Sequence, residues 1–92
     1  MQTFVWEAFP HRMIRGHGEH RLNNIRGHIL NTIGIMPIQI RSHKDTFGNY
    51  KVKFSVREED VLYCYRRIEL ILKENRELVI YDENDEVFKT RI

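Results

Sequence analysis

The densest group of chemically active side chains lies in residues 10–21, PHRMIRGHGEHR. This segment contains three arginines, three histidines and two glycines. A helix is expected to begin at its end, where the first backbone N–H groups have no helical partner and lie at the positive end of the helix dipole. A glycine-containing loop at such a point can hold a phosphate. We therefore predict an anion site with Arg12, Arg15 and Arg21 around it, the alternative being an ordinary polar connection.

The histidines of this segment raise two further kinds of chemistry. His17 and His20 lie three residues apart and could supply nitrogen ligands to a metal. His11 or His28 could be a third ligand, but no cysteine pair or acidic partner completes a zinc pattern. Two imidazoles beside an arginine are also the parts of a metal-free ribonuclease. Because spacing alone does not place them, we predict no metal, no cofactor and no catalytic residue, and the ribonuclease is our third hypothesis.

A second basic set lies on two segments of alternating polarity, residues 37–43 (PIQIRSH) and 49–56 (NYKVKFSV). Strand side chains alternate between the two faces of a sheet, so the apolar parity, which includes Ile38 and Ile40, is expected to face a core. The opposite parity would face away from it and carries Gln39, Arg41, His43, Lys51, Lys53 and Ser55. Cations at strand spacing match the phosphates of a nucleic acid. Exposed strands also carry Lys and Arg simply to discourage aggregation, which is the alternative.

Residue types and periodicity predict the elements that would position both sets. We expect a strand at 3–9, a helix at 19–32, a hairpin from 37–43 and 49–56, a helix at 58–74 and a strand within 76–92. The order β-α-β-β-α-β predicts an α+β, ferredoxin-like split βαβ fold, in which a four-stranded antiparallel sheet has both helices on one face. The DEND turn at 82–85 would allow an extra C-terminal hairpin strand. Function is expected on the open face of the sheet.

The element order resembles that of the RNA-recognition-motif family, which stacks bases on aromatic side chains of its two central strands. In this chain the alternation turns Phe54 toward the core and Lys51 and Lys53 outward, so the third strand offers no stacking surface. An aromatic surface for base stacking would be possible only on the first strand, if Phe4 and Trp6 face outward. Contacts with phosphate and sugar, or with a structured RNA by shape, need no platform and are the expectation here.

The charge distribution divides the chain into a basic and an acidic part. Residues 1–57 carry nine Lys/Arg against three acids and all five histidines, residues 58–92 carry six against ten, and the net charge is +2. With 92 residues the chain is too short for two cores, so we predict a single domain, 1–92. The absence of a long apolar run and of a signal-peptide pattern favours a cytoplasmic protein that does not enter a membrane. The lone Cys64 is expected to be buried and unreactive.

From these observations we rank two functions ahead of the ribonuclease. The first is a non-enzymatic nucleic-acid-binding domain that grips phosphates, with RNA slightly ahead of DNA as the partner. Its predicted contacts are Arg12, Arg15, Arg21, Arg41, His43, Lys51 and Lys53. The second is a small regulator or inhibitor that binds another protein, because the helix at 58–74 has a broad apolar face near Tyr63 and Tyr65. The split of charge also favours head-to-tail association of two copies.

Overall fold

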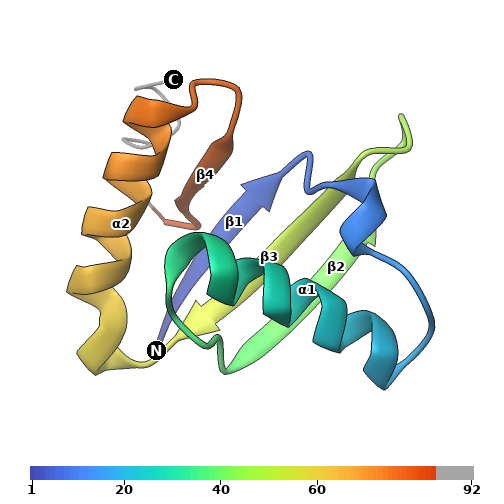
Figure 1. The fold of residues 1–92 in the computed structure, drawn as a ribbon, viewed down its shortest axis with the longest axis horizontal. Coiled ribbons are helices and arrows are strands. Elements are labelled where there is room, and N and C mark those ends of the chain that lie inside the picture. The colour runs from blue at the N-terminus through green and yellow to red at the C-terminus, as the bar shows by residue number, and fades with distance from the viewer. Residues whose placement is uncertain (85–92) are drawn as a thin grey trace.

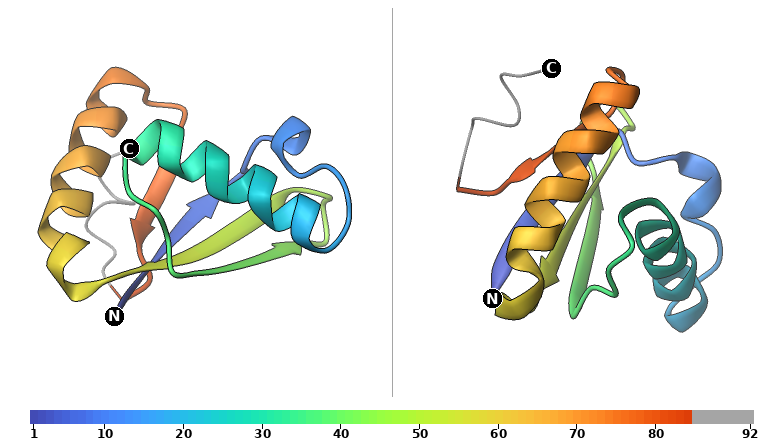
Figure 2. Two further views of the ribbon diagram at one scale, coloured as in Figure 1. Left: turned by 60° about the horizontal axis from the view of Figure 1, so that its bottom comes forward. Right: turned by 60° about the vertical axis from the view of Figure 1, so that its left-hand side comes forward.

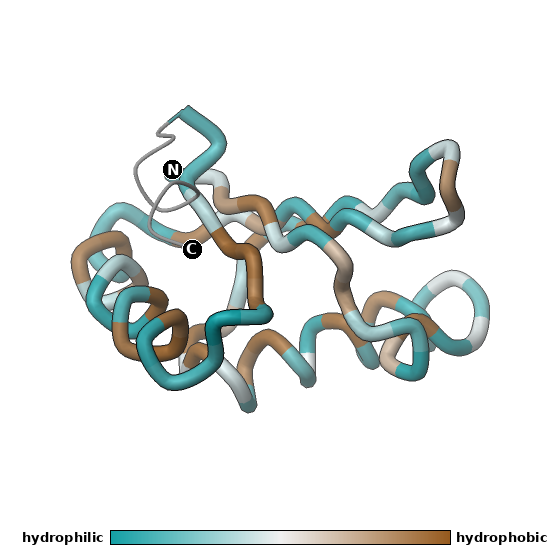
Figure 3. Tube along the Cα trace, turned by 90° about the horizontal axis from the view of Figure 1, so that it is seen from above, coloured by the Kyte–Doolittle hydropathy of each residue, from teal (hydrophilic) through white to brown (hydrophobic). Residues whose placement is uncertain are grey.

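The computed structural model describes residues 1–84, which form two layers (Figure 1). In chain order the elements are β1 (Gln2–Glu7), the 3₁₀ helix η1 (His11–Met13), α1 (Glu19–Ile33), β2 (Gln39–Lys44), β3 (Tyr50–Val56), the 3₁₀ helix η2 (Glu58–Asp60), α2 (Val61–Glu74) and β4 (Val79–Asp82). The strands form one sheet in the order β2-β3-β1-β4, with every neighbouring pair antiparallel. Both helices lie on the same face of this sheet (Figures 2 and 3). The predicted ferredoxin-like α+β fold is confirmed.

The elements differ from the prediction mainly at their ends. β1 ends at Glu7 rather than at Phe9, because Ala8 has a positive φ of 53° and the chain turns toward η1. β2 begins only at Gln39, so Ile38 lies in the connection before it and is exposed instead of pointing into the core. The first residues of the second predicted helix form η2. The extra hairpin strand predicted after β4 falls outside the described residues.

The core lies between the sheet and the two helices. In the register of β1 and β3, Phe4 is opposite Phe54 and Trp6 is opposite Val52, and all four side chains are at most 1% exposed. The helices add the apolar side chains that recur every three or four residues, Ile25, Ile29 and Ile33 of α1 and Cys64, Ile68, Ile71 and Leu72 of α2. Because Phe4 and Trp6 face the helices, the aromatic platform considered for the first strand is absent.

Cys64 is fully buried on α2, as predicted. Desolvation, with smaller contributions from the negative charges of Asp60 and Asp82, raises the pKa of its thiol to about 12. The thiol therefore stays protonated at neutral pH and is a poor nucleophile.

α1 and α2 are the two long helices of residues 1–84. Neither of them has the length and apolar character that a membrane-crossing helix needs.

Candidate nucleic-acid interface

The seven side chains predicted to bind phosphate lie on two different surfaces. Four of them point away from the helices on β2 and β3, and we call this surface the sheet face: Arg41, His43, Lys51 and Lys53. The other three lie on η1, on the loop after it and at the start of α1. Figure 2 (left) shows these segments beside the β2–β3 turn at one end of the molecule. We call this surface the basic end and include Lys44 of β2 in it: Arg12, Arg15, Arg21 and Lys44.

Carboxylates balance much of the charge on the sheet face. Arg41 and Lys53 are directly opposite each other on β2 and β3, a like-charge pair that is unfavourable unless it is screened. The Nζ atom of Lys53 lies 3.5 Å from Oε1 of Glu83, and the Nζ atom of Lys51 lies 3.6 Å from Oε1 of Glu7 on β1. Of the arginine and lysine side chains on the sheet face, Arg41 is therefore the one that forms no ion pair with a carboxylate of residues 1–84.

The centre of the sheet face holds a small polar pocket of about 220 Å³. Arg41, Lys53, Thr3 and Ser55 are among the residues that line it, and Oγ1 of Thr3 lies 3.0 Å from Oγ of Ser55. The aromatic side chain of β4 on this face is Tyr81, which is only 8% exposed and donates a hydrogen bond to the carboxylate of Glu7. Tyr81 is therefore held in place and does not offer an open ring for base stacking.

The basic end is organised around the ring of Tyr50, the first residue of β3. The guanidinium carbon of Arg21 lies 5.4 Å and Nζ of Lys44 6.0 Å from the ring centre, within the range of cation–π attraction. The ring of His11 meets it edge-on at 5.1 Å. The N–H of Phe9 donates to the carbonyl of Tyr50 at 3.0 Å, which ties the exit of β1 to the hairpin. Side chains from η1, α1 and β2 thus converge on one aromatic ring.

The loop between η1 and α1 is held against the helix by its own polar groups. Nε of Arg15 donates to the carbonyl of Arg12 at 2.9 Å, and the side chain of Asn24 donates to the carbonyl of Arg15 at 3.1 Å. Gly16 and Gly18 have φ values of 82° and 56°, which side chains with a Cβ rarely adopt. No side chain of residues 1–84 caps the start of α1, so its first N–H groups are available to an anion from solvent.

None of the four cations of the basic end forms an ion pair with a carboxylate of residues 1–84. Asp45, the acid of the adjoining hairpin turn, instead accepts the N–H groups of Phe47 and Asn49 through Oδ1 at 2.8 and 2.9 Å. Segments 10–21 and 44–50 together contain these four cations and two carboxylates, Glu19 and Asp45, so this end of the molecule carries a net positive charge.

His28, considered above as a third metal ligand, packs against aromatic side chains of the core. The centre of its ring lies 5.3 Å from that of Trp6 and 5.2 Å from that of Phe9. Its position three residues after Ile25 places it at the border of the buried stripe, where the sheet covers it. Burial, and secondarily the charge of Arg12, lowers the pKa of His28.

His17 and His20, the pair considered for a metal or for acid–base catalysis, are both exposed. In the part of the chain that the structure describes, no group of three His, Cys, Asp or Glu side chains could hold a metal ion. The ribonuclease hypothesis gains no support from this arrangement.

Lys44 and Tyr50 were not among the predicted contacts. Both close the β2–β3 hairpin, where they are directly opposite each other. The sequence contained a signal for this pairing, because the short connection 45–49 between two alternating segments brings its flanking residues together. The approach of Arg21 to the same ring carried no such signal, since it depends on how α1 packs against the sheet.

Comparisons with known proteins assign no family to this arrangement. No protein-family model, no curated protein and no solved structure matches the chain. Function is therefore inferred from the side chains of the basic end and of the sheet face.

Proposed function

We propose that this chain is a non-enzymatic nucleic-acid-binding domain whose primary contact is the basic end. The observation that carries the proposal is a set of four cations without an ion pair to any carboxylate of residues 1–84: Arg12, Arg15, Arg21 and Lys44. Such cations displace the counterions of nucleic-acid phosphates, which supplies most of the sequence-independent affinity. Arg41 would be a secondary contact on the sheet face, with weaker contributions from Lys51 and Lys53, whose charges Glu7 and Glu83 offset.

Contact with phosphate and sugar is the mode of binding that these side chains support. Phe4, Trp6 and Phe54 are in the core, so the central strands carry no outward aromatic side chain for base stacking. The ring of Tyr50 already has Arg21 and Lys44 beside it. We rank RNA ahead of DNA because a backbone-gripping surface can recognise a structured RNA by its shape and its 2′-hydroxyl groups.

Fluorescence anisotropy tests the proposal with three labelled probes: a single-stranded RNA, an RNA hairpin and a DNA duplex. We expect binding at about 50 mM salt that weakens steeply as the salt concentration rises. The purified protein should also lose absorbance at 260 nm after a high-salt or nuclease wash. Failure of all three probes to bind at low salt would contradict the proposal.

A regulator that binds another protein is the second candidate, and one feature of α2 favours it. Leu62, Tyr63 and Leu70 are 63%, 51% and 49% exposed, so part of the predicted apolar face lies outside the core. Exposed apolar groups that lie together on a surface mark protein contacts. A partner that the native chain retains from nuclease-treated lysate, and that a Leu62→Asp, Leu70→Asp variant loses, would favour this function. The variant should bind RNA normally if the first proposal is correct.

A further inference from the structure

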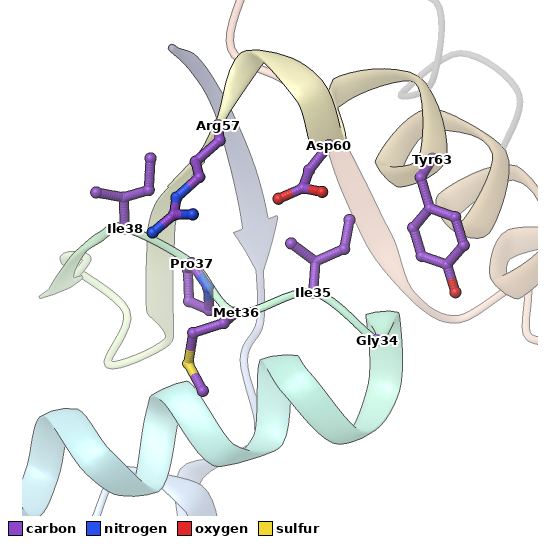
Figure 4. A pocket seen from close by; sticks show the side chains of 8 residues that line it. All are labelled: Gly34, Ile35, Met36, Pro37, Ile38, Arg57, Asp60 and Tyr63. Carbon is purple, nitrogen blue, oxygen red and sulfur yellow. The ribbon is translucent and has the colours of Figure 1, made fainter.

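A second concave site lies away from both basic surfaces, between the end of α1 and the start of α2 (Figure 4). The connection 34–38 forms one side of this pocket, and Arg57, Asp60 and Tyr63 form the other. Its volume of about 660 Å³ is within the range of sites for small molecules. The proposed nucleic-acid contact uses none of these residues.

The backbone of the connection explains why a hollow forms here. Gly34 ends α1 in the left-handed conformation, with φ 85°, and its N–H donates to the carbonyl of Leu30. A Cβ at Gly34 would lie 3.3 Å from the hydroxyl oxygen of Tyr63, so a side chain at this position would crowd the wall of the pocket. The N–H of Ile38 then donates to the carbonyl of Ser55 at 2.8 Å, which anchors the connection to β3. The connection is thus fixed at both ends.

Apolar side chains at this site face solvent. Met36, Ile38 and Tyr63 are 52%, 44% and 51% exposed, although each is large and hydrophobic. Met36 and Ile38 lie on the connection and Tyr63 on the opposite side, so the pocket has exposed apolar surface on both sides (Figure 4), and covering such surface is favourable in water.

Opposite charges enter the same pocket from Arg57, the residue before η2, and from Asp60, the last residue of η2. Figure 4 shows the guanidinium of Arg57 and the carboxylate of Asp60 projecting over the connection from neighbouring positions. The N–H of Asp60 donates to the carbonyl of Arg57 at 2.9 Å, which closes the turn between them. They form no ion pair with each other, and Arg57 makes only an exposed contact of 3.7 Å with Glu59. Such an exposed pair contributes little and leaves the guanidinium available to a ligand.

We propose that this pocket binds a free α-amino acid with an aliphatic or aromatic side chain. Arg57 would hold the carboxylate through two parallel hydrogen bonds, and Asp60 would accept hydrogen bonds from the ammonium group. The ligand's side chain would cover the exposed apolar surface of the pocket. A simple anion would be repelled by Asp60, and a simple cation by Arg57. An α-amino acid carries both charges on one carbon beside an apolar group, so it complements all three features.

NMR titration of the ¹⁵N-labelled chain tests this site with L-leucine, L-methionine and L-phenylalanine at millimolar concentrations. We expect saturable shifts of the amide signals of residues 34–38, Arg57 and Tyr63 (Pro37 has no N–H). Leucinamide lacks the carboxylate and 4-methylpentanoate lacks the ammonium group, and each should bind at least about tenfold more weakly than L-leucine, because one charge-assisted contact is lost. No saturable shift with any of the three amino acids, or equal binding of either analogue, would overturn the proposal.

Matched variants separate the pocket from general charge effects. Arg57→Gln and Asp60→Asn should each lower the affinity for L-leucine at least about tenfold. Arg66→Gln and Glu74→Gln make the same charge changes on exposed positions of α2 outside the pocket and should leave the affinity unchanged. If Asp60→Asn does not fold, Arg57→Gln decides, because that side chain is 69% exposed and outside the core. Undiminished binding by Arg57→Gln would overturn the proposal.

Discussion

The sheet face and the basic end carry the same kinds of cation, yet among the described residues only the cations of the sheet face form ion pairs with carboxylates. On the sheet face, the antiparallel register places Lys51 opposite Glu7, and the segment after β4 brings Glu83 to Lys53. At the basic end, Arg21 of α1 and Lys44 of the hairpin meet at the ring of Tyr50, and neither forms an ion pair with a carboxylate of the described residues. The charge of a surface therefore depends on which distant segments fold against it, and not only on the content of its own segment.

The largest effect is expected from removing the charge of the basic end. A triple variant, Arg12→Gln, Arg21→Gln, Lys44→Gln, should lower the affinity for single-stranded RNA about 100-fold at about 0.1 M salt. The slope of log K against log salt should become shallower by about 2, because each lost phosphate contact removes about 0.7. Anisotropy titrations over a series of salt concentrations measure both quantities.

The matched variant removes three cations from the sheet face: Arg41→Gln, Lys51→Gln, Lys53→Gln. We expect its affinity to fall by less than about tenfold, since two of these cations already have carboxylates beside them. An equal loss of RNA affinity in both triple variants would show that the sheet face and the basic end contribute equally to binding, and would contradict the primary role of the basic end.

A second experiment removes the carboxylates that form ion pairs with the lysines of the sheet face, so that this surface, like the basic end, has cations without ion pairs. Glu7→Gln with Glu83→Gln frees Lys51 and Lys53, and the affinity for RNA should rise about threefold to tenfold at low salt. The control, Glu74→Gln with Glu77→Gln, changes the net charge equally at two exposed positions elsewhere. A similar rise in the control would mean that overall charge, and not the local pairing, sets the affinity.

A smaller effect is expected from replacing Tyr50, whose ring lies beside Arg21 and Lys44. Tyr50→Leu removes the cation–π attraction to Arg21 and Lys44, and the affinity for RNA should fall about threefold because the two cations are less well oriented. Tyr50→Phe keeps the ring and should bind as the native chain does. Equal binding by the Leu and Phe variants would show that the ring plays no part in positioning the cations.

The smallest expected effect concerns pH. The pKa of His28 is lowered from 6.5 by burial and by Arg12, so the folded protein binds this proton less tightly than the unfolded chain does. Its contribution to the free energy of unfolding is full above pH 6.5 and decreases as the pH falls toward the lowered pKa. Urea unfolding at several pH values should show this decrease in the native chain.

Two variants check the assignment of this pH dependence to His28. His28→Asn should flatten it, whereas His43→Asn, at an exposed position of β2, should preserve it. Arg12→Gln should move the pKa of His28 upward in an NMR titration, because it removes one of the two causes of the shift. A pKa of His28 that is unchanged by Arg12→Gln would show that the charge of Arg12 does not affect the protonation of His28.

The order of elements and most of the core could be predicted from local pattern. The alternation in 49–56 correctly turned Val52 and Phe54 inward and Lys51 and Lys53 outward, because the side-chain period of a strand follows from its backbone geometry. The ambiguous alternation of the first strand could not be decided in the same way. In the folded chain Phe4 and Trp6 take the inner face and are buried there, while Val5 on the opposite parity is buried too, so burial alone does not separate the two parities.

The sequence by itself determined the ferredoxin-like order of strands and helices, the outward position of the strand cations and the burial of Cys64. These features depend on periods of two and 3.6 residues, which short stretches of chain already express. Only the tertiary structure decided which cations have carboxylate neighbours, that His28 packs under the sheet, and that Arg57 and Asp60 share a pocket with Met36. Such contacts join residues far apart in the chain, and no local period specifies them.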